Sequence, residues 1–135
     1  MHEKDIEIVK YKMNHASEDY RAAKLNFDGE CYYAAINRAY YCIFHMMNAL
    51  LMFKGMSFKS HAAVISAFQR EYIKTGIFDE SFTKIISKAS DMRNDSDYEK
   101  GFAADEDMVK KSLADVKFFN DTILEYINGL IAQNQ

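Results

Sequence analysis

The sequence predicts an all-α protein, folded as an up-and-down antiparallel bundle of four to five helices. The 135 residues include no proline and only five glycines, so few positions interrupt a helix. The composition is 49% hydrophobic and 14% aromatic, which is enough to fill the core of one domain of this length. Apolar residues also recur at alternating three- and four-residue spacing over long stretches, as in helices with one buried side. We expect a single domain over residues 1–135.

The first two predicted helices are long. The first has one apolar stripe, formed by Ile6, Val9, Met13, Ala16, Tyr20, Ala23 and Phe27. The pair Asp28-Gly29 is a turn signal that ends this helix. The second is expected from about residue 30 to 54, with its end near Gly55. It is apolar on two sides, which is typical of a helix in the middle of a bundle.

Three further helices follow. Ser60 is suited to cap a third helix, which is expected to end near Gly76. Asp79 can cap a fourth, and its apolar pattern gives way to a polar run at residues 93–101. A last long helix is expected to start near Asp105. The short connections between these segments favour antiparallel neighbours.

The first candidate site is a polar stripe on the second predicted helix. Its members share an arc of roughly 100° on an α-helix, and they are Asn37, Arg38, Tyr41, His45 and Asn48. Because unpaired buried polar groups are costly, the stripe must find partners or face a cleft or a second subunit. Arg38 is suited to bind a phosphate with two hydrogen bonds, and His45 to move a proton at neutral pH. The alternative is a structural network, in which Arg38 pairs with an acid of a neighbouring helix and His45 is a satisfied interior imidazole.

The second candidate site is the polar sequence RNDSDY at residues 93–98. On a helix, Arg93 and Asp97 are i,i+4 partners, and so are Asn94 and Tyr98. One interpretation is a surface ion pair that closes the fourth helix, worth about 0.5 kcal/mol. The other is a recognition patch at the end of that helix. The sequence leaves both interpretations open.

Several classes of function are disfavoured. The four histidines, at positions 2, 15, 45 and 61, show no three- or four-residue spacing, so we expect no metal site and no cofactor. The net charge of −3 argues against a general nucleic-acid binder but allows a local basic cleft. No apolar run approaches the ~20 residues needed to span a bilayer. The charged N-terminal segment is unlike a signal peptide, so a cytoplasmic location is expected.

Three segments together carry a family resemblance. They are NRAYYCIFH at residues 37–45, SHAAVISAFQREYIKTG at residues 60–76 and the R-x-x-x-D-Y motif at residues 93–98. In their order and spacing they resemble the compact prokaryotic branch of the HEPN domain family (higher eukaryotes and prokaryotes nucleotide-binding). The resemblance covers roughly Glu18 to Ile127. It implies a bundle of four or five helices that commonly dimerises, with the conserved polar motif near the dimer cleft.

The resemblance also implies a chemistry. Nuclease members of the family cleave RNA without a metal, using an arginine, often followed by asparagine, and a histidine after four to six intervening residues. Arg93 and Asn94 match the start of that motif, whereas Tyr98 stands where the histidine would fall. A tyrosine, with an ordinary pKa near 10, is a poor general base at neutral pH. Ribonuclease activity is therefore left open, with Arg93, Tyr98 and His45 as the candidate catalytic residues.

The resemblance further implies a partner. Many prokaryotic members act beside a minimal nucleotidyltransferase in a toxin–antitoxin pair. In some of these pairs the transferase adenylylates a tyrosine near the arginine motif. Tyr98 is the candidate acceptor in this chain.

These observations lead to one main hypothesis and two alternatives. The main hypothesis is a dimeric HEPN subunit that binds a nucleotide or RNA phosphate, or a partner nucleotidyltransferase. Its site would comprise Arg93, Asn94, Asp97 and Tyr98, supported from the second helix by Arg38, Tyr41 and His45. The alternatives are a metal-independent endoribonuclease toxin, and a purely structural interaction module whose interface includes the aromatic residues Phe118, Phe119 and Tyr126. The main hypothesis requires the stripe at residues 37–48 and the run at residues 93–98 to meet in space.

Overall fold

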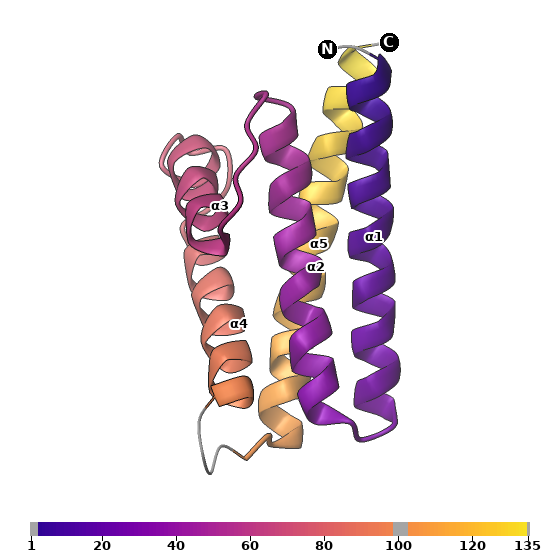
Figure 1. Cartoon of the computed structure of the whole chain (residues 1–135), viewed down its shortest axis with the longest axis vertical. Helices are drawn as coiled ribbons and strands as arrows, with labels where there is room; N and C mark the ends of the chain where they lie inside the picture. Colours follow the sequence, from indigo (N-terminus) through magenta and orange to yellow (C-terminus); the bar gives the residue numbers. More distant parts are fainter. Residues whose placement is uncertain (1–2, 99–102, 135) are drawn as a thin grey trace.

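The computed structural model describes residues 3–98 and 103–134 (Figure 1). Within these ranges the chain forms five α-helices and one short π-helical segment, and no strand. The elements are α1 (Glu3–Asp28), α2 (Tyr32–Met52), α3 (His61–Phe68), the π-helix η1 (Gln69–Ile73), α4 (Ser81–Tyr98) and α5 (Glu106–Gln133). The all-α prediction is confirmed. No helix in the described ranges is both long enough and apolar enough to cross a bilayer.

Helix α2 occupies the centre of the bundle. It contacts α1, α3, α4 and α5, and Figure 1 shows α1 and α4 on its two sides with α5 behind it. Both apolar sides of α2 are accordingly buried: one comprises Ile36, Tyr40, Ile43, Met47 and Leu50, and the other Ala35, Ala39, Cys42, Met46 and Ala49. The polar stripe between them is left half-buried, at the surface between the neighbouring helices.

The predicted helix ends are also observed. The side chains of Ser60, Asp79 and Asp105 each accept a hydrogen bond from a backbone N–H at the start of the following helix, at 3.1, 3.0 and 2.8 Å. These bonds satisfy donors that have no partner inside the helix. Gly55 and Gly76 both have positive φ angles, 67° and 82°, which suits residues that follow a helical segment.

Aromatic residues form a second part of the core, where α3, η1, α4 and α5 meet. Phe119 of α5 is fully buried and packs against Phe68 and Phe82, with ring centroids 6.0 and 4.8 Å away. Tyr126 is partly buried against Tyr72 and Phe78 (ring centroids 6.4 and 5.2 Å away), whereas Phe118 is 55% exposed. Most of the aromatic excess of α5 is thus explained by packing within the chain.

The polar run at the end of α4 is helical, as the i,i+4 interpretation of residues 93–98 requires. The apolar pattern stops at Met92, but the helix continues through the polar run to Tyr98. Met92 is buried, and Arg93 is held by contacts with α2, so the polar run starts as an ordered helical turn. This places Arg93, Asn94 and Asp97 on a regular helix.

Candidate functional site

Tyr41 on α2 is the centre of the candidate site. The guanidinium carbon of Arg38, on the same helix, lies 5.0 Å from the centroid of the Tyr41 ring. The guanidinium carbon of Arg93, from α4, lies 5.4 Å from the same centroid. Nη2 of Arg93 also donates a hydrogen bond to the Tyr41 hydroxyl, 3.3 Å long, across 52 positions in the chain. The stripe on α2 and the run at residues 93–98 therefore meet at one aromatic ring.

Arg38 is anchored by a buried acid of α1. Its Nη1 donates to Oδ1 of Asp19 at 3.0 Å, and its Nε and Nη2 donate to the amide oxygen of Asn37 at 3.3 and 2.9 Å. The side chain of Asp19 is only 5% exposed, whereas that of Arg38 is 36% exposed. Arg38 therefore pairs with an acid of a neighbouring helix, as the structural alternative proposed, but this pairing involves only its Nη1 atom. The guanidinium still reaches solvent beside Tyr41.

His45 is held by the other oxygen of the same carboxylate. Oδ2 of Asp19 accepts a hydrogen bond from Nδ1 of His45 at 2.7 Å. Burial lowers the pKa of His45, and the hydrogen bond and charge of Asp19 act in the opposite direction. With the pKa lowered overall, the ring is neutral at pH 7. Because Nδ1 carries the proton, Nε2 is left as a potential acceptor.

Arg93 has a donor without a partner. Its guanidinium lies over the Tyr40 ring, 5.0 Å from the centroid, as well as beside Tyr41. The Nε atom is buried and has no hydrogen-bond partner among the described residues. The predicted i,i+4 pair with Asp97 is present only as an ion pair of 3.8 Å between Nε and Oδ2, beyond hydrogen-bond length. Since an unsatisfied buried N–H is costly, this atom is a natural point for an incoming acceptor.

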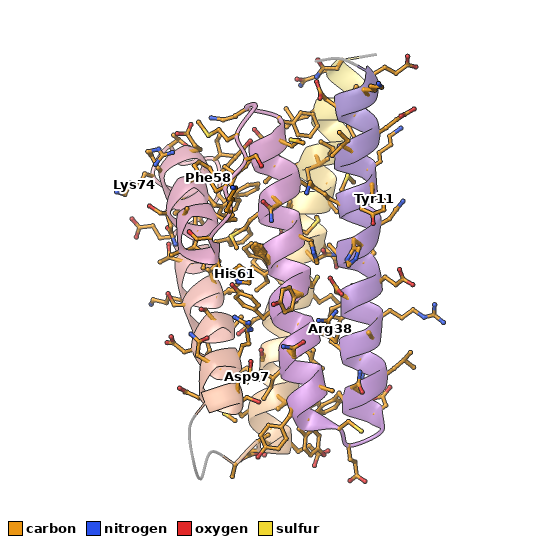
Figure 2. The ribbon with its side chains drawn as sticks, viewed as in Figure 1. Tyr11, Arg38, Phe58, His61, Lys74 and Asp97 are labelled. Carbon is orange, nitrogen blue, oxygen red and sulfur yellow. The ribbon has the colours of Figure 1, made fainter. Side chains whose placement is uncertain are left out.

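His61 is a site residue that its position in the sequence did not indicate. It begins α3, and its Nδ1 lies 2.8 Å from the Tyr40 hydroxyl (Figure 2). Its ring packs on Phe44 at 4.1 Å and lies 5.8 Å from the Tyr41 ring. Burial lowers the pKa of His61, and the positive charge of Arg93 lowers it further. Two imidazoles and two guanidinium groups therefore surround Tyr41, since the His45 ring lies 6.0 Å away.

This arrangement leads to a titration that can be measured. We expect His61 to titrate below the ordinary histidine pKa of about 6.5 in an NMR pH titration. In the Arg93→Gln variant, loss of the nearby positive charge should move the His61 pKa upward, toward the ordinary value. The exposed Arg70→Gln variant should leave it unchanged. A His61 pKa that is the same in wild type and Arg93→Gln would contradict the proximity of these two groups.

The remaining predicted residues take lesser places in the structure. Asn94 and Asp97 are exposed on the last turns of α4. Figure 2 shows Asp97 near the C-terminal end of α4, below His61 in this view. Asn48 donates to the carbonyl oxygen of Phe44 in its own helix at 3.3 Å. The side chain of Tyr98 lies outside the described residues, so its role as an acceptor of adenylylation stays a prediction.

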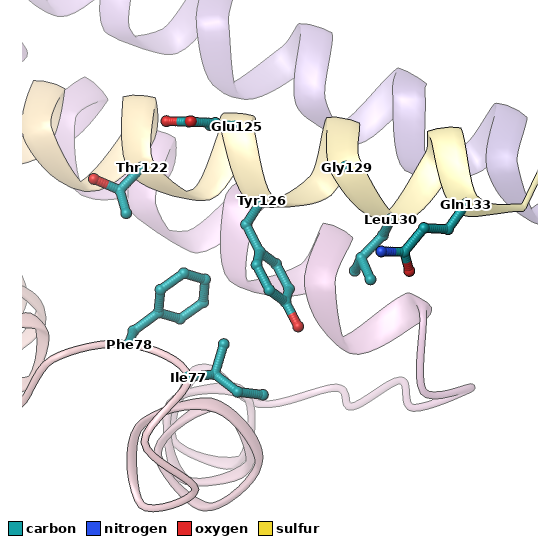
Figure 3. Close-up of a pocket in the computed structure, with 8 residues that line it drawn as sticks. All are labelled: Ile77, Phe78, Thr122, Glu125, Tyr126, Gly129, Leu130 and Gln133. Carbon is teal, nitrogen blue, oxygen red and sulfur yellow. The ribbon is translucent and has the colours of Figure 1, made fainter.

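A separate cavity lies away from the Tyr41 cluster. It has a volume of about 440 Å³ and lies between α5 and the turn that follows η1 (Figure 3). Phe78 and Tyr126 lie next to each other in its wall, with ring centroids 5.2 Å apart, and Ile77 lies beside them. Its lining is largely apolar, and it shares no residue with the arginine site.

The fold and the site together define a small helical-bundle domain with an arginine–tyrosine cluster between its central helix and the end of a neighbouring helix. This class agrees with the motifs described above. The chain matches the HEPN domain family over residues 9–126, and it belongs to this family.

Curated relatives cover most of the chain. It is 35% identical over 130 residues to a protein of Thermotoga maritima described as a UPF0332 protein, covering 96% of this chain and 98% of that protein. It is 38% identical over 96 residues to a protein of Methanocaldococcus jannaschii named "Putative toxin MJ0605", covering 70% and 72% of the two chains. A UPF0332 protein of Archaeoglobus fulgidus is 28% identical over 114 residues, with 84% and 90% covered.

Proposed function

We propose that this HEPN protein binds a phosphate group of RNA or of a nucleotide between Arg38 and Arg93. The observation that carries the proposal is the buried, unpartnered Nε of Arg93 beside a second guanidinium, with Tyr41 between them. Guanidinium groups are planar, permanently charged and suited to bidentate contact with phosphate oxygens. A phosphate oxygen that replaced the Asp97 carboxylate near Nε would give a hydrogen bond to a donor that has none in the structure.

The surrounding contacts support a preorganised site. Asp19 and Asn37 fix one guanidinium through hydrogen bonds, and the rings of Tyr40 and Tyr41 hold the other. The side chains of Arg38 and Arg93 remain 36% and 21% exposed, so part of each can be reached from solvent, whereas Nε of Arg93 itself is buried. Little side-chain entropy then has to be lost on binding.

We further propose that the protein acts as one component of a toxin–antitoxin pair, with a minimal nucleotidyltransferase as partner. The support comes from the HEPN family and from the relative of Methanocaldococcus jannaschii named "Putative toxin MJ0605". A homodimer, expected from the family resemblance, is part of this proposal. Co-purification of an untagged partner encoded next to this chain, together with light scattering of the isolated protein, tests both assemblies.

The binding proposal is tested by fluorescence anisotropy with a short labelled single-stranded RNA. We expect saturable binding that weakens as salt concentration rises, because cationic side chains replace counterions of the phosphates. Unlabelled nucleotide monophosphate should compete. Failure of the RNA and of the nucleotide to bind at low salt would overturn the proposal.

A second candidate function is metal-independent RNA cleavage, favoured by the 2.7 Å hydrogen bond between Asp19 and His45. An acid that orients an imidazole in this way is a recurring device of general base catalysis. The two arginines would stabilise the additional negative charge of the transition state. The same RNA, incubated with the protein in the presence of a chelator and examined for cleavage products, separates binding alone from catalysis.

A further inference from the structure

A second cluster lies on the α1 side of the site. It comprises His15, Asp19 and His45, each of which offers one ligand atom, and these atoms lie within 4.8 Å of one another. His15 and Asp19 are i,i+4 neighbours on α1, and His45 approaches from α2 with its ring 4.3 Å from that of His15. Two imidazoles and a carboxylate on adjacent helices form a common set of zinc ligands.

The distances in this cluster are close to those of a metal site. In a tetrahedral zinc site with bonds of about 2.0–2.1 Å, neighbouring ligand atoms are roughly 3.4 Å apart. Nδ1 of His15 lies 3.4 Å from Oδ2 of Asp19, already at that separation. Nδ1 of His45 lies 2.7 Å from the same oxygen, so this contact would lengthen by about 0.7 Å. All three ligand atoms already lie within 4.8 Å of one another, so small movements of the side chains would bring them to these separations.

We propose that His15, Asp19 and His45 bind one divalent transition-metal ion of the zinc type. Two nitrogen ligands and one oxygen ligand favour zinc, cobalt or nickel over magnesium or calcium, which prefer oxygen alone. Three protein ligands leave a fourth position for water. This site adjoins the phosphate site and shares Asp19, which anchors Arg38, and His45 with it, but metal binding does not depend on the proposed function.

Arg38 has two opposing effects on this site. Its hydrogen bond to Oδ1 of Asp19 fixes the carboxylate and leaves Oδ2 directed at the two imidazoles, as outer-shell partners do in metal sites. Its positive charge, with that of Lys12 near His45, lowers the affinity for a cation. The two positive charges therefore favour reversible binding of the metal ion. The bound ion would replace the hydrogen bond between Asp19 and His45.

The sequence could not indicate this site from its histidines. His15 and His45 lie 30 positions apart, and the spacing rule that looks for paired histidines on one helix does not apply to them. The third ligand is an aspartate, and the three atoms meet only because α1 packs against α2.

Two measurements on the full chain test the proposal. Zinc is titrated into the purified, chelator-treated protein in a calorimeter, and cobalt is added in parallel while the visible spectrum is recorded. We expect one site per chain and the strong visible absorption of tetrahedral cobalt. The His15 side chain is 44% exposed, so the core does not depend on it. In His15→Ala we expect the affinity for zinc to fall at least tenfold.

The matched control is Asp28→Ala, which removes an exposed carboxylate of α1 outside the cluster and should keep wild-type affinity. A circular dichroism spectrum equal to that of wild type establishes that each variant is folded. If neither metal binds the wild-type protein, the proposal is wrong. If His15→Ala binds as tightly as wild type, the metal is held elsewhere and the assignment is equally wrong.

Discussion

Replacing Asp19 with alanine is expected to lower the free energy of unfolding by about 2–4 kcal/mol, because it breaks a buried carboxylate's pairing with two side chains of another helix. The carboxylate is buried and joins α1 to α2 through Arg38 and His45. Its removal leaves Nη1 of Arg38 and the Nδ1–H of His45 without acceptors. Because Arg38 is 36% exposed, water compensates part of the loss, which keeps the effect below that of a fully buried ion pair.

The measurement is urea denaturation followed by circular dichroism. Asp28→Ala is the matched control on the same helix, because the side chains of Asp28 and its partner Lys24 are 58% and 53% exposed. We expect that change to stay within about 0.5 kcal/mol of wild type. Asp19→Asn keeps the side-chain volume but removes the charge, so its free energy of unfolding should lie between those of Asp19→Ala and Asp28→Ala. Equal stability of Asp19→Ala and Asp28→Ala would show that the carboxylate does not hold the two helices together.

Replacing Arg93 with glutamine is expected to weaken RNA binding about 10- to 100-fold, the size of one or two lost charge-assisted hydrogen bonds. Arg93 contributes the buried Nε, the contact with Tyr41 and one of the two positive charges of the site. Arg93→Lys should bind with intermediate affinity, because an ammonium group restores the charge but not the planar pair of donors. Anisotropy titrations at one fixed salt concentration provide the measurement.

Arg70→Gln is the control for the effect of net charge. Arg70 lies on η1, is largely exposed and pairs with Glu71 at 2.9 Å. Surface charge effects of this kind are about 0.5 kcal/mol, so the loss of Arg70 should change RNA affinity less than threefold. Wild-type RNA affinity in Arg93→Gln, with the protein folded, would exclude Arg93 from the binding site. An equal loss in Arg93→Gln and Arg70→Gln would indicate unspecific attraction to the RNA.

Asp19 shows how sequence analysis missed a residue on which the site depends. The apolar stripe of α1 includes Ala16 and Ala23, and Asp19 lies three positions after one and four before the other, at the edge of that stripe. A carboxylate at such a position is buried and needs a cationic partner. That signal was available in the sequence, but it could not identify Arg38 and His45 as the partners.

The polar run at residues 93–98 shows a second limit. Its composition was compatible with a solvated loop or with a helical turn, because it lacks apolar residues that would show a period. The structure extends α4 through it, and the contact of Arg93 with Tyr41 supports the helical turn. Local propensity alone does not distinguish these outcomes, since the stabilising contact comes from another helix.

The sequence by itself determined the helices, their caps and the central place of α2. These properties follow from the spacing of apolar residues and from side chains that bond to the backbone a few positions away, which are local interactions. The tertiary structure decided which polar side chains share a partner. Asp19 meets Arg38 and His45, and Arg93 meets Tyr41, across 19, 26 and 52 positions. Such pairs are set by the packing and rotation of whole helices against one another, to which residues far from the site contribute.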